Sequence, residues 1–201
     1  MAEILLIGTS NPGKLREYAV LLAELPVRLI SLRDAGLDSM EVAEPYETFE
    51  ENSRHKALIY AKASGVIALA DDTGLVVDAL GGRPGVYSAR YGGPTDRDRY
   101  LKLLSEMTEV PDDKRTARFV CVITAADPSG KQAESARGTV EGRITRAPGV
   151  GTEGFGYDAV FMPDGFDVVL SAISMAEKNR ISHRGMAARA LIPALKQMLE
   201  P

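Results

Sequence analysis

Residues 4–14 read Ile4-Leu5-Leu6-Ile7-Gly8-Thr9-Ser10-Asn11-Pro12-Gly13-Lys14, and this segment decides the fold. The continuous apolar run at its start is typical of a strand that is buried on both faces. Asn11 and Pro12 favour a helix start, because asparagine caps a first turn and proline suits the first helical position. A buried strand that leads directly into a helix indicates the opening unit of an α/β sheet.

The rest of the chain continues the alternation. We expect further strands over 27–30, 66–70, 117–125, 134–144 and 158–162. We expect helices after Asn11, over 51–64, from the Thr95–Asp98 capping pair to about Met107, from the Ser174–Glu177 pair, and over 184–199. Residues 71–94, rich in glycine, are expected to form a long loop. Because some strands follow strands directly, we predict an α/β fold with a mixed central sheet flanked by helices. The length suits one domain over 1–201 or two small lobes that share a cleft.

Composition excludes several classes of function. The chain has 201 residues, and 24 Lys and Arg against 28 Asp and Glu give a net charge of −4. This balance argues against binding of a nucleic acid polymer, which requires a basic face. No apolar run approaches the ~20 residues of a membrane span. One cysteine forms no internal disulfide, and this favours a reducing, cytoplasmic compartment.

The loop over 8–14 is a candidate anion site. Backbone N–H groups at a helix start, with Lys14 beside them, favour a phosphate. The pattern resembles a P-loop, G-x-x-x-x-G-K followed by Ser or Thr, but position 15 is Leu. Leu15 lacks the hydroxyl that holds magnesium in a P-loop. A plain strand–turn–helix connection with an exposed lysine remains the alternative.

Adjacent carboxylates at Asp71 and Asp72 follow the predicted apolar strand over 66–70. Such a pair at a strand end can hold a divalent metal or position a water, and α/β folds place ligands at these ends. A solvated turn is the alternative. The acidic segment over 41–51 could complete a metal site, but its spacing does not identify the ligand.

Two further groups lie in the second half of the chain. Glycines flank Phe155 in Gly154-Phe155-Gly156-Tyr157-Asp158, so its ring could face a flat ligand while Asp158 accepts hydrogen bonds. Lys178 precedes Ser182-His183-Arg184-Gly185, which would place hydrogen-bond donors at a helix start. A turn around a core aromatic residue and a structural helix cap are the respective alternatives.

Taken together, the motifs resemble the inosine triphosphate pyrophosphatase family, also called XTP/dITP diphosphatases. The resemblance covers nearly the whole chain, in order. It is carried by Thr9-Ser10-Asn11-Pro12-Gly13-Lys14, Thr48-Phe49-Glu50-Glu51-Asn52, Ala70-Asp71-Asp72-Thr73-Gly74-Leu75, Pro84-Gly85-Val86-Tyr87-Ser88-Ala89-Arg90-Tyr91, Gly154-Phe155-Gly156-Tyr157-Asp158 and Ile181-Ser182-His183-Arg184-Gly185.

The resemblance implies two lobes around a nucleotide-binding cleft and a homodimer. It implies Mg²⁺-dependent hydrolysis of deaminated purine nucleoside triphosphates (ITP, dITP, XTP) to the monophosphate and pyrophosphate. A P-loop-like nucleotide kinase and a nucleotide-binding module without catalysis are the alternatives, and Leu15 speaks against the kinase.

The resemblance also implies roles for individual residues. Asp72 would be the general base and a metal ligand, and Lys56 would neutralise phosphate. The family's glutamates are spaced differently here, and we favour Glu44 as the second metal ligand. The substrate-binding residues would be Thr9, Ser10, Asn11, Pro12, Gly13 and Lys14 around the nucleotide, Thr73 beside the base catalyst, Phe155, Gly156, Tyr157 and Asp158 around the purine, Lys178 on the nucleotide, and His183 with Arg184 at the purine edge.

Overall fold

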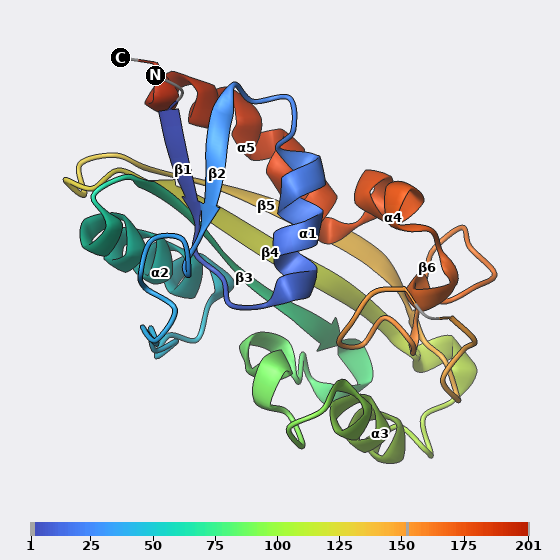
Figure 1. Ribbon diagram of the computed structural model, residues 1–201. Helices are drawn as coiled ribbons and strands as arrows, with labels where there is room; N and C mark the ends of the chain where they lie inside the picture. The colour runs from blue at the N-terminus through green and yellow to red at the C-terminus, as the bar shows by residue number, and fades with distance from the viewer. Residues whose placement is uncertain (1–2, 152, 201) are drawn as a thin grey trace. The chain divides into compact units, whose positions relative to one another are not determined.

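The computed structural model describes residues 3–151 and 153–200. Its six-stranded sheet has the order β2-β1-β3-β4-β5-β6 (Figure 1). Strand β1 pairs in parallel with β2 and β3, whereas β5 pairs antiparallel with β6, so the sheet is mixed as predicted. The strands are β1 Glu3–Ile7, β2 Val27–Ser31, β3 Ile67–Val77, β4 Thr116–Ala126, β5 Ala133–Ile144 and β6 Phe161–Pro163.

Three helices begin at the predicted caps, whereas α2 begins at Phe49, two residues before the predicted start, with Thr48 as its cap. Asn11 caps α1, the Thr95–Asp98 capping box opens α3, and Ser174 caps α4. The α-helices are α1 Pro12–Leu21, α2 Phe49–Ser64, α3 Asp96–Glu106, α4 Met175–Ile181 and α5 His183–Leu199. Short 3₁₀ turns are η1 Asp78–Leu80, η2 Gly85–Arg90, η3 Asp112–Lys114 and η4 Leu170–Ala172. No helix in the described part of the chain is both long enough and apolar enough to span a membrane.

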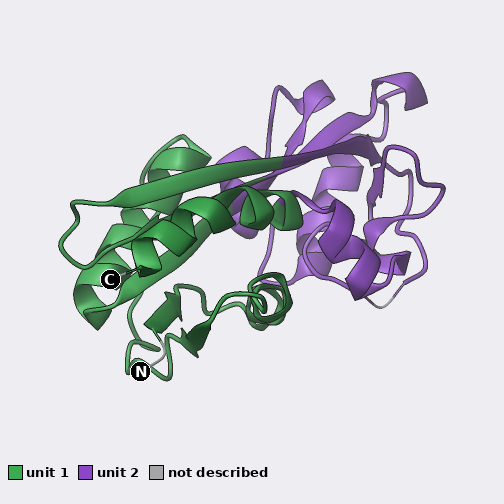
Figure 2. Cartoon of the chain, turned by 90° about the horizontal axis from the view of Figure 1, so that it is seen from above, with its two compact units in different colours: residues 1–72, 121–138, 184–201 green, residues 73–120, 139–183 purple. Residues whose placement is uncertain are grey.

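The chain divides into two compact units, coloured in Figure 2. Unit 1 comprises 1–72, 121–138 and 184–201, and unit 2 comprises 73–120 and 139–183. The boundary falls inside β3, between Asp72 and Thr73, and again between His183 and Arg184. Several of the predicted site residues are therefore neighbours in sequence but members of different units.

Strand alternation sorts the side chains of β3 in unit 1. Leu69 packs in a core cluster with residues of α1 and α5, whereas Ala68 and Ala70 pack in a second cluster with residues of α2. Successive strand residues point to opposite faces of a sheet. Asp71 therefore lies on the α1 and α5 face, and Asp72 lies on the α2 face.

Unit 2 has its own apolar core, formed by residues of β3, α3, β4, β5, β6 and η4. Within it, the buried Arg115 guanidinium donates to the carbonyls of Met107, Ile144 and Thr145 at 2.7, 2.8 and 2.9 Å. Met107 is the C-cap of α3, so Arg115 fastens the end of this helix to the end of β5. Phe155 and Lys178 belong to the same unit as this arginine.

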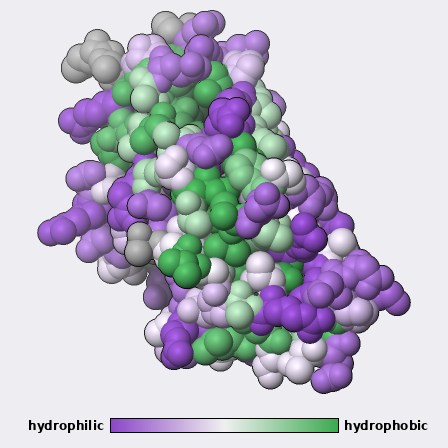
Figure 3. All heavy atoms as spheres, turned by 90° about the vertical axis from the view of Figure 1, so that its right-hand side faces the viewer, coloured by the Kyte–Doolittle hydropathy of each residue, from purple (hydrophilic) through white to green (hydrophobic). Residues whose placement is uncertain are grey.

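The surface is mixed in polarity. Figure 3 shows apolar patches among hydrophilic side chains on one face of the molecule. Large apolar side chains exposed in the described residues include Val20, Leu101, Val150, Val168 and Met186.

Three sequence predictions need correction. Strand β3 does not end at Ala70 but continues to Val77, so Asp71 and Asp72 are strand residues and not loop residues. Strand β6 begins only at Phe161, because 156–160 form a turn. Helix α1 buries Glu17 and Tyr18 where the apolar spacing pointed to Ala19, which is exposed.

Candidate functional site

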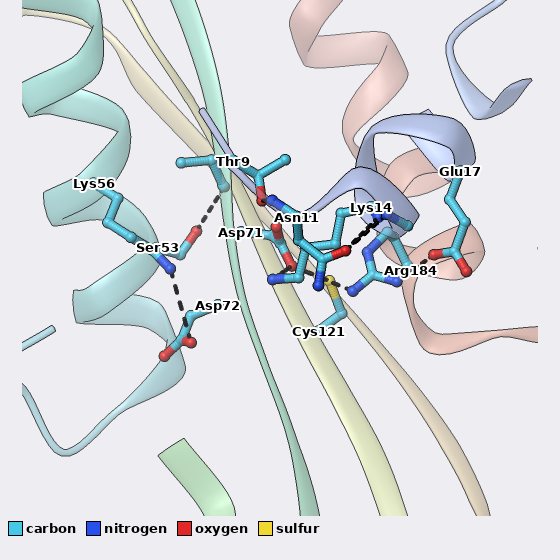
Figure 4. Close-up of polar contacts among 12 residues, drawn as sticks. Thr9, Asn11, Lys14, Glu17, Ser53, Lys56, Asp71, Asp72, Cys121 and Arg184 are labelled. Atoms are coloured by element: carbon cyan, nitrogen blue, oxygen red, sulfur yellow. Dashed lines mark hydrogen bonds and ion pairs between the residues drawn. The ribbon is translucent and has the colours of Figure 1, made fainter. Parts of the chain in front are cut away.

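The turn between β1 and α1 is organised by Asn11 (Figure 4). Its Oδ1 accepts from the backbone N–H groups of Gly13 and Lys14 at 2.8 and 3.2 Å. Its own N–H donates to Thr9 Oγ1 at 3.2 Å. Gly8 allows a close approach of α2, since a Cβ there would lie 2.6 Å from a ring carbon of Tyr60. The turn is thus preorganised, and two of the helix N–H groups predicted to cradle phosphate are occupied by the cap.

Asp71 is a buried carboxylate surrounded by cations. Lys14 Nζ donates to its Oδ2 at 2.8 Å, and Arg184 Nη2 lies 3.5 Å from the same oxygen. Burial would raise the pKa of Asp71, but Lys14, Arg184 and Lys56 outweigh it and hold the pKa far below its usual range. Asp71 is therefore a fixed negative charge and not a proton acceptor near neutral pH.

Arg184 is held by a second buried carboxylate. Its Nη1 donates to Glu17 Oε2, and both side chains are almost fully enclosed. Burial would lower the pKa of Arg184, but Glu17 and Asp71 outweigh it and raise the pKa well above the usual value. Glu17, Arg184, Asp71 and Lys14 thus form one alternating network on the α1 and α5 face of the sheet, as Figure 4 shows.

Asp72 has different surroundings on the α2 face. Its Oδ2 accepts from Asn52 Nδ2 at 3.1 Å, and its Oδ1 lies 3.9 Å from Lys56 Nζ. Burial raises the pKa of Asp72 to about 6, with Glu44 adding to the rise while Lys56 and Asn52 oppose it. A carboxylate with this pKa is largely ionised at pH 7 and can still accept a proton, which suits a general base.

Lys56 links the two carboxylates proposed as metal ligands. Its Nζ donates to Glu44 Oε1 at 2.5 Å and lies near Asp72. Burial lowers its pKa, but Asp71, Asp72 and Glu44 outweigh burial and raise it. In the described residues no three His, Cys, Asp or Glu side chains gather as a metal centre. Two carboxylates suffice for Mg²⁺, which typically takes one or two carboxylates together with substrate phosphates and waters.

Unit 2 brings together a second group of predicted residues. Lys178 Nζ donates to Asp158 Oδ2 at 2.6 Å, and it lies 5.0 Å from the centre of the Phe155 ring. Asp158 Oδ2 also accepts from the Phe155 N–H at 2.8 Å. Gly154 permits this turn, since its φ is +83° and a Cβ would collide with the Asp158 carboxylate. An aromatic face, a cation and a carboxylate are thereby held together.

The remaining predicted residues of unit 2 are more structural in setting. Tyr157 is buried, and its hydroxyl donates to the Ser88 carbonyl at 3.0 Å. Burial raises the pKa of this hydroxyl well above its usual value. His183 stacks on Phe119 with ring centres 4.7 Å apart. Thr73 lies in β3, directly after Asp72, and Gly156 N donates to Asp96 Oδ2 at 2.7 Å.

Sequence reasoning missed the contributions of Glu17 and Asn52. Glu17 follows Lys14 by one helical turn, and its position beside Tyr18 on a buried face was the available signal. Asn52 lay within the motif Thr48 to Asn52 but had no assigned role. It lies one helical turn before Lys56, and two polar side chains at this spacing lie on the same helix face and can contact the same partner. The contacts of Glu17 with Arg184 and of Asn52 with Asp72 each join residues far apart in the sequence.

Comparison with known proteins places the chain among well-defined relatives. The Ham1 family model matches residues 5–194. A dITP/XTP pyrophosphatase of Symbiobacterium thermophilum is 46% identical over 197 residues, covering 98% of this chain and 96% of that protein. One of Escherichia coli is 44% identical over 196 residues, covering 94% and 96%. A solved HAM1 protein from Coxiella burnetii has a TM-score of 0.86 at 37% identity, covering 98% of this chain and 100% of that chain.

Proposed function

The chain belongs to the Ham1 family, and on that premise we propose that it hydrolyses deaminated purine nucleoside triphosphates to the monophosphate and pyrophosphate. The observation that carries the proposal within the site is the contrast at Asp71 and Asp72. Asp71 is a fixed charge that holds Lys14 and Arg184, whereas burial raises the pKa of Asp72 to about 6 when no metal is bound. Hydrolysis of a triphosphate requires both cations and a base.

The chemistry divides among the residues of unit 1. Lys14 and Lys56 bind the phosphate oxygens as point charges. Asp72 accepts a proton from water as the water oxygen forms a bond to the α-phosphorus. The bond from that phosphorus to the bridging oxygen breaks, and pyrophosphate leaves with the electron pair. Thr9, Ser10 and the cap of α1 shape the turn along which the nucleotide lies.

Mg²⁺ fits this donor set as the cofactor. Asp72 and Glu44 supply hard carboxylate oxygens, and Lys56, which now links them, can turn its charge to phosphate. Bound Mg²⁺ would supply charge stabilisation on the phosphoryl oxygens.

Selection of the base falls to the donors of the second group and the start of α5. Phe155 stacks on the purine, with Lys178 and Asp158 at its edge. By the family resemblance, His183 and Arg184 would donate hydrogen bonds to the keto oxygen at position 6, and an adenine amino group cannot accept them. Net hydrogen bonds to charged groups contribute ~1.5–3 kcal/mol each, so two can shift selectivity by several powers of ten.

The decisive experiment measures pyrophosphate release from ITP, XTP, dITP and ATP with Mg²⁺. We expect ITP, XTP and dITP to be cleaved with similar kcat/KM and ATP much more slowly. Arg184→Ala should reduce the ratio of kcat/KM for ITP to kcat/KM for ATP, mainly by lowering the value for ITP. A native protein that cleaves ATP as readily as ITP contradicts the proposal. Phosphate transfer to an acceptor would indicate a kinase, and binding without turnover a regulatory module.

The proposal extends to the setting of the enzyme. We place the activity in one domain over 1–201, with two lobes around the nucleotide, in a cytoplasmic homodimer that binds neither nucleic acid polymers nor membranes. The single cysteine, Cys121, is buried and is consistent with a reducing compartment. Light scattering during size-exclusion chromatography tests the dimer.

A further inference from the structure

The segment that carries Glu44 has little structure of its own. Residues 41–47 lie between β2 and α2, contain no helix or strand, and are mostly exposed. Glu44 nevertheless meets Lys56, whose Nζ also lies near Asp72. An exposed segment without regular structure samples many conformations unless another group holds it. Something must therefore fix the main chain on which Glu44 is carried.

Asn52 supplies that attachment. Its side chain is fully buried, and its Oδ1 accepts from the Tyr46 N–H at 3.0 Å. Its Nδ2 donates to the Tyr46 carbonyl at 3.0 Å and to Asp72 Oδ2 at 3.1 Å. A primary amide offers an acceptor oxygen and two N–H donors, and all of these are used here. The amide thus joins both main-chain groups of Tyr46 to the Asp72 carboxylate.

Helix geometry places this amide beside Lys56. Residues four apart on a helix lie on the same face, so Asn52 and Lys56 approach Asp72 from adjacent turns of α2. Lys56 holds Glu44 through its side chain, whereas Asn52 holds the main chain two residues further on, at Tyr46. The Lys56 contact can be exchanged for phosphate, whereas the two contacts from Asn52 to the Tyr46 main chain join uncharged groups.

We propose that Asn52 is a positioning residue for the hydrolysis, because its buried amide fastens the 41–47 segment, and with it Glu44, to Asp72. The inference rests on the proposed function of the site. Asn52 itself transfers no proton and meets the reacting atoms only through Asp72. A misplacement of about 1 Å in a catalytic group can lower the rate by ~10²-fold.

The test compares Asn52→Leu, which is close in shape and removes all these hydrogen bonds, with the smaller Asn52→Ser. We expect kcat for ITP with Mg²⁺ to fall by ~10²-fold while KM stays within about threefold, because the phosphate and purine contacts remain. Independently of activity, hydrogen–deuterium exchange should accelerate selectively in 41–47, since the Tyr46 N–H loses its acceptor.

Ser53→Ala is the matched control. Ser53 is equally buried on the same helix, and its hydroxyl contacts the Ala70 carbonyl at 3.1 Å and Thr124 at 2.8 Å, away from the 41–47 segment. This variant should lose stability without losing kcat. A merely structural Asn52 would behave in the same way.

The outcomes separate the two proposals. Native kcat in both Asn52 variants, or unchanged exchange in 41–47, overturns the positioning role while the hydrolase assignment stands. If the native protein releases no pyrophosphate from ITP, dITP or XTP, the proposed function fails and the positioning role fails with it. A selective rise in exchange together with a fall in kcat, absent from Ser53→Ala, supports it.

Discussion

The two faces of the sheet at Asp71 and Asp72 shift the pKa of a buried carboxylate in opposite directions. On the α1 and α5 face, Asp71 meets Lys14 and Arg184, and its pKa is driven far down. On the α2 face, the neighbours of Asp72 include Lys56 and the Asn52 amide, and burial raises its pKa to about 6. Consecutive strand residues reach opposite faces, so adjacent members of one motif can take different tasks. One organises charge, and the other is available for chemistry.

Replacing the Asp72 carboxylate should have the largest effect. Asp72→Asn removes the proton acceptor and is expected to lower kcat for ITP by ~10²–10⁴-fold, since general-base loss costs that much. Nucleotide binding should remain measurable by calorimetry, because Lys14 and Lys56 are kept. Near-native turnover would show that Asp72 is not the base, and the contrast between the two carboxylates would then have no part in the hydrolysis.

The matching change on the other face should act on stability. Asp71→Asn removes the buried carboxylate that pairs with Lys14 and Arg184, and breaking such a buried pair typically costs about 3–5 kcal/mol. The pKa of Asp71 is depressed, so this deficit should be complete above the unfolded pKa of about 3.9 and shrink as pH falls below it. Urea unfolding measures it. Asp78→Asn, which weakens an exposed pair with Arg118, is the control and should cost at most ~1 kcal/mol.

The lysines sharpen the comparison further, because each belongs to one face. Lys14→Ala and Lys56→Ala should each lower kcat/KM for ITP by ~10–10²-fold, the scale of a lost hydrogen bond between charged groups. The stability of the fold should change less than the activity does, since Asp71 keeps its contact with Arg184 and Asp72 can take up a proton. Steady-state kinetics and thermal unfolding decide. Unchanged kinetic constants in both variants would leave these lysines as structural partners of the carboxylates.

The sequence predicted the parts of this arrangement that depend on local signals. Asn11, Thr95 and Ser174 cap the expected helices, because a cap requires only a side chain and the first turn. The motifs also identified the family, which the comparisons confirm. Roles assigned to Lys56, Phe155 and the other site residues remain predictions.

Contacts across the sheet lay beyond local signals. Charges and a glycine at 71–74 indicated a loop, whereas β3 continues through them because Lys14 and Arg184 neutralise Asp71 from distant parts of the chain. Glu17 can likewise be buried because Arg184, far away in the sequence, neutralises it. Propensity describes a residue among its neighbours in sequence, and a buried charge depends on partners that only the fold supplies.

The smallest expected effect is also the one that contrasts the faces most directly. Asp72 binds a proton more tightly in the folded protein, with a pKa of about 6 against about 3.9 unfolded. Its ionised form therefore opposes folding, fully above pH 6, and this cost disappears as pH falls from about 6 to about 4. Asp72→Asn should then stabilise the protein at pH 7.5 without added metal by about 1–3 kcal/mol, since a tenfold change in proton affinity corresponds to about 1.4 kcal/mol.

Urea unfolding in the presence of a chelator at pH 7.5 and pH 4.5 measures this gain. The gain should shrink towards zero at the lower pH, where the native carboxyl is largely protonated, whereas the Asp71→Asn deficit should be equally present at both values because the unfolded Asp71 is still mostly ionised. If the two substitutions change the free energy of unfolding in opposite directions at pH 7.5, the Asp71 carboxylate stabilises the fold and the Asp72 carboxylate destabilises it. If Asp72→Asn is instead less stable than the native protein at pH 7.5, both carboxylates stabilise the fold, Asp71 as the counter-ion of Lys14 and Asp72 as the counter-ion of Lys56.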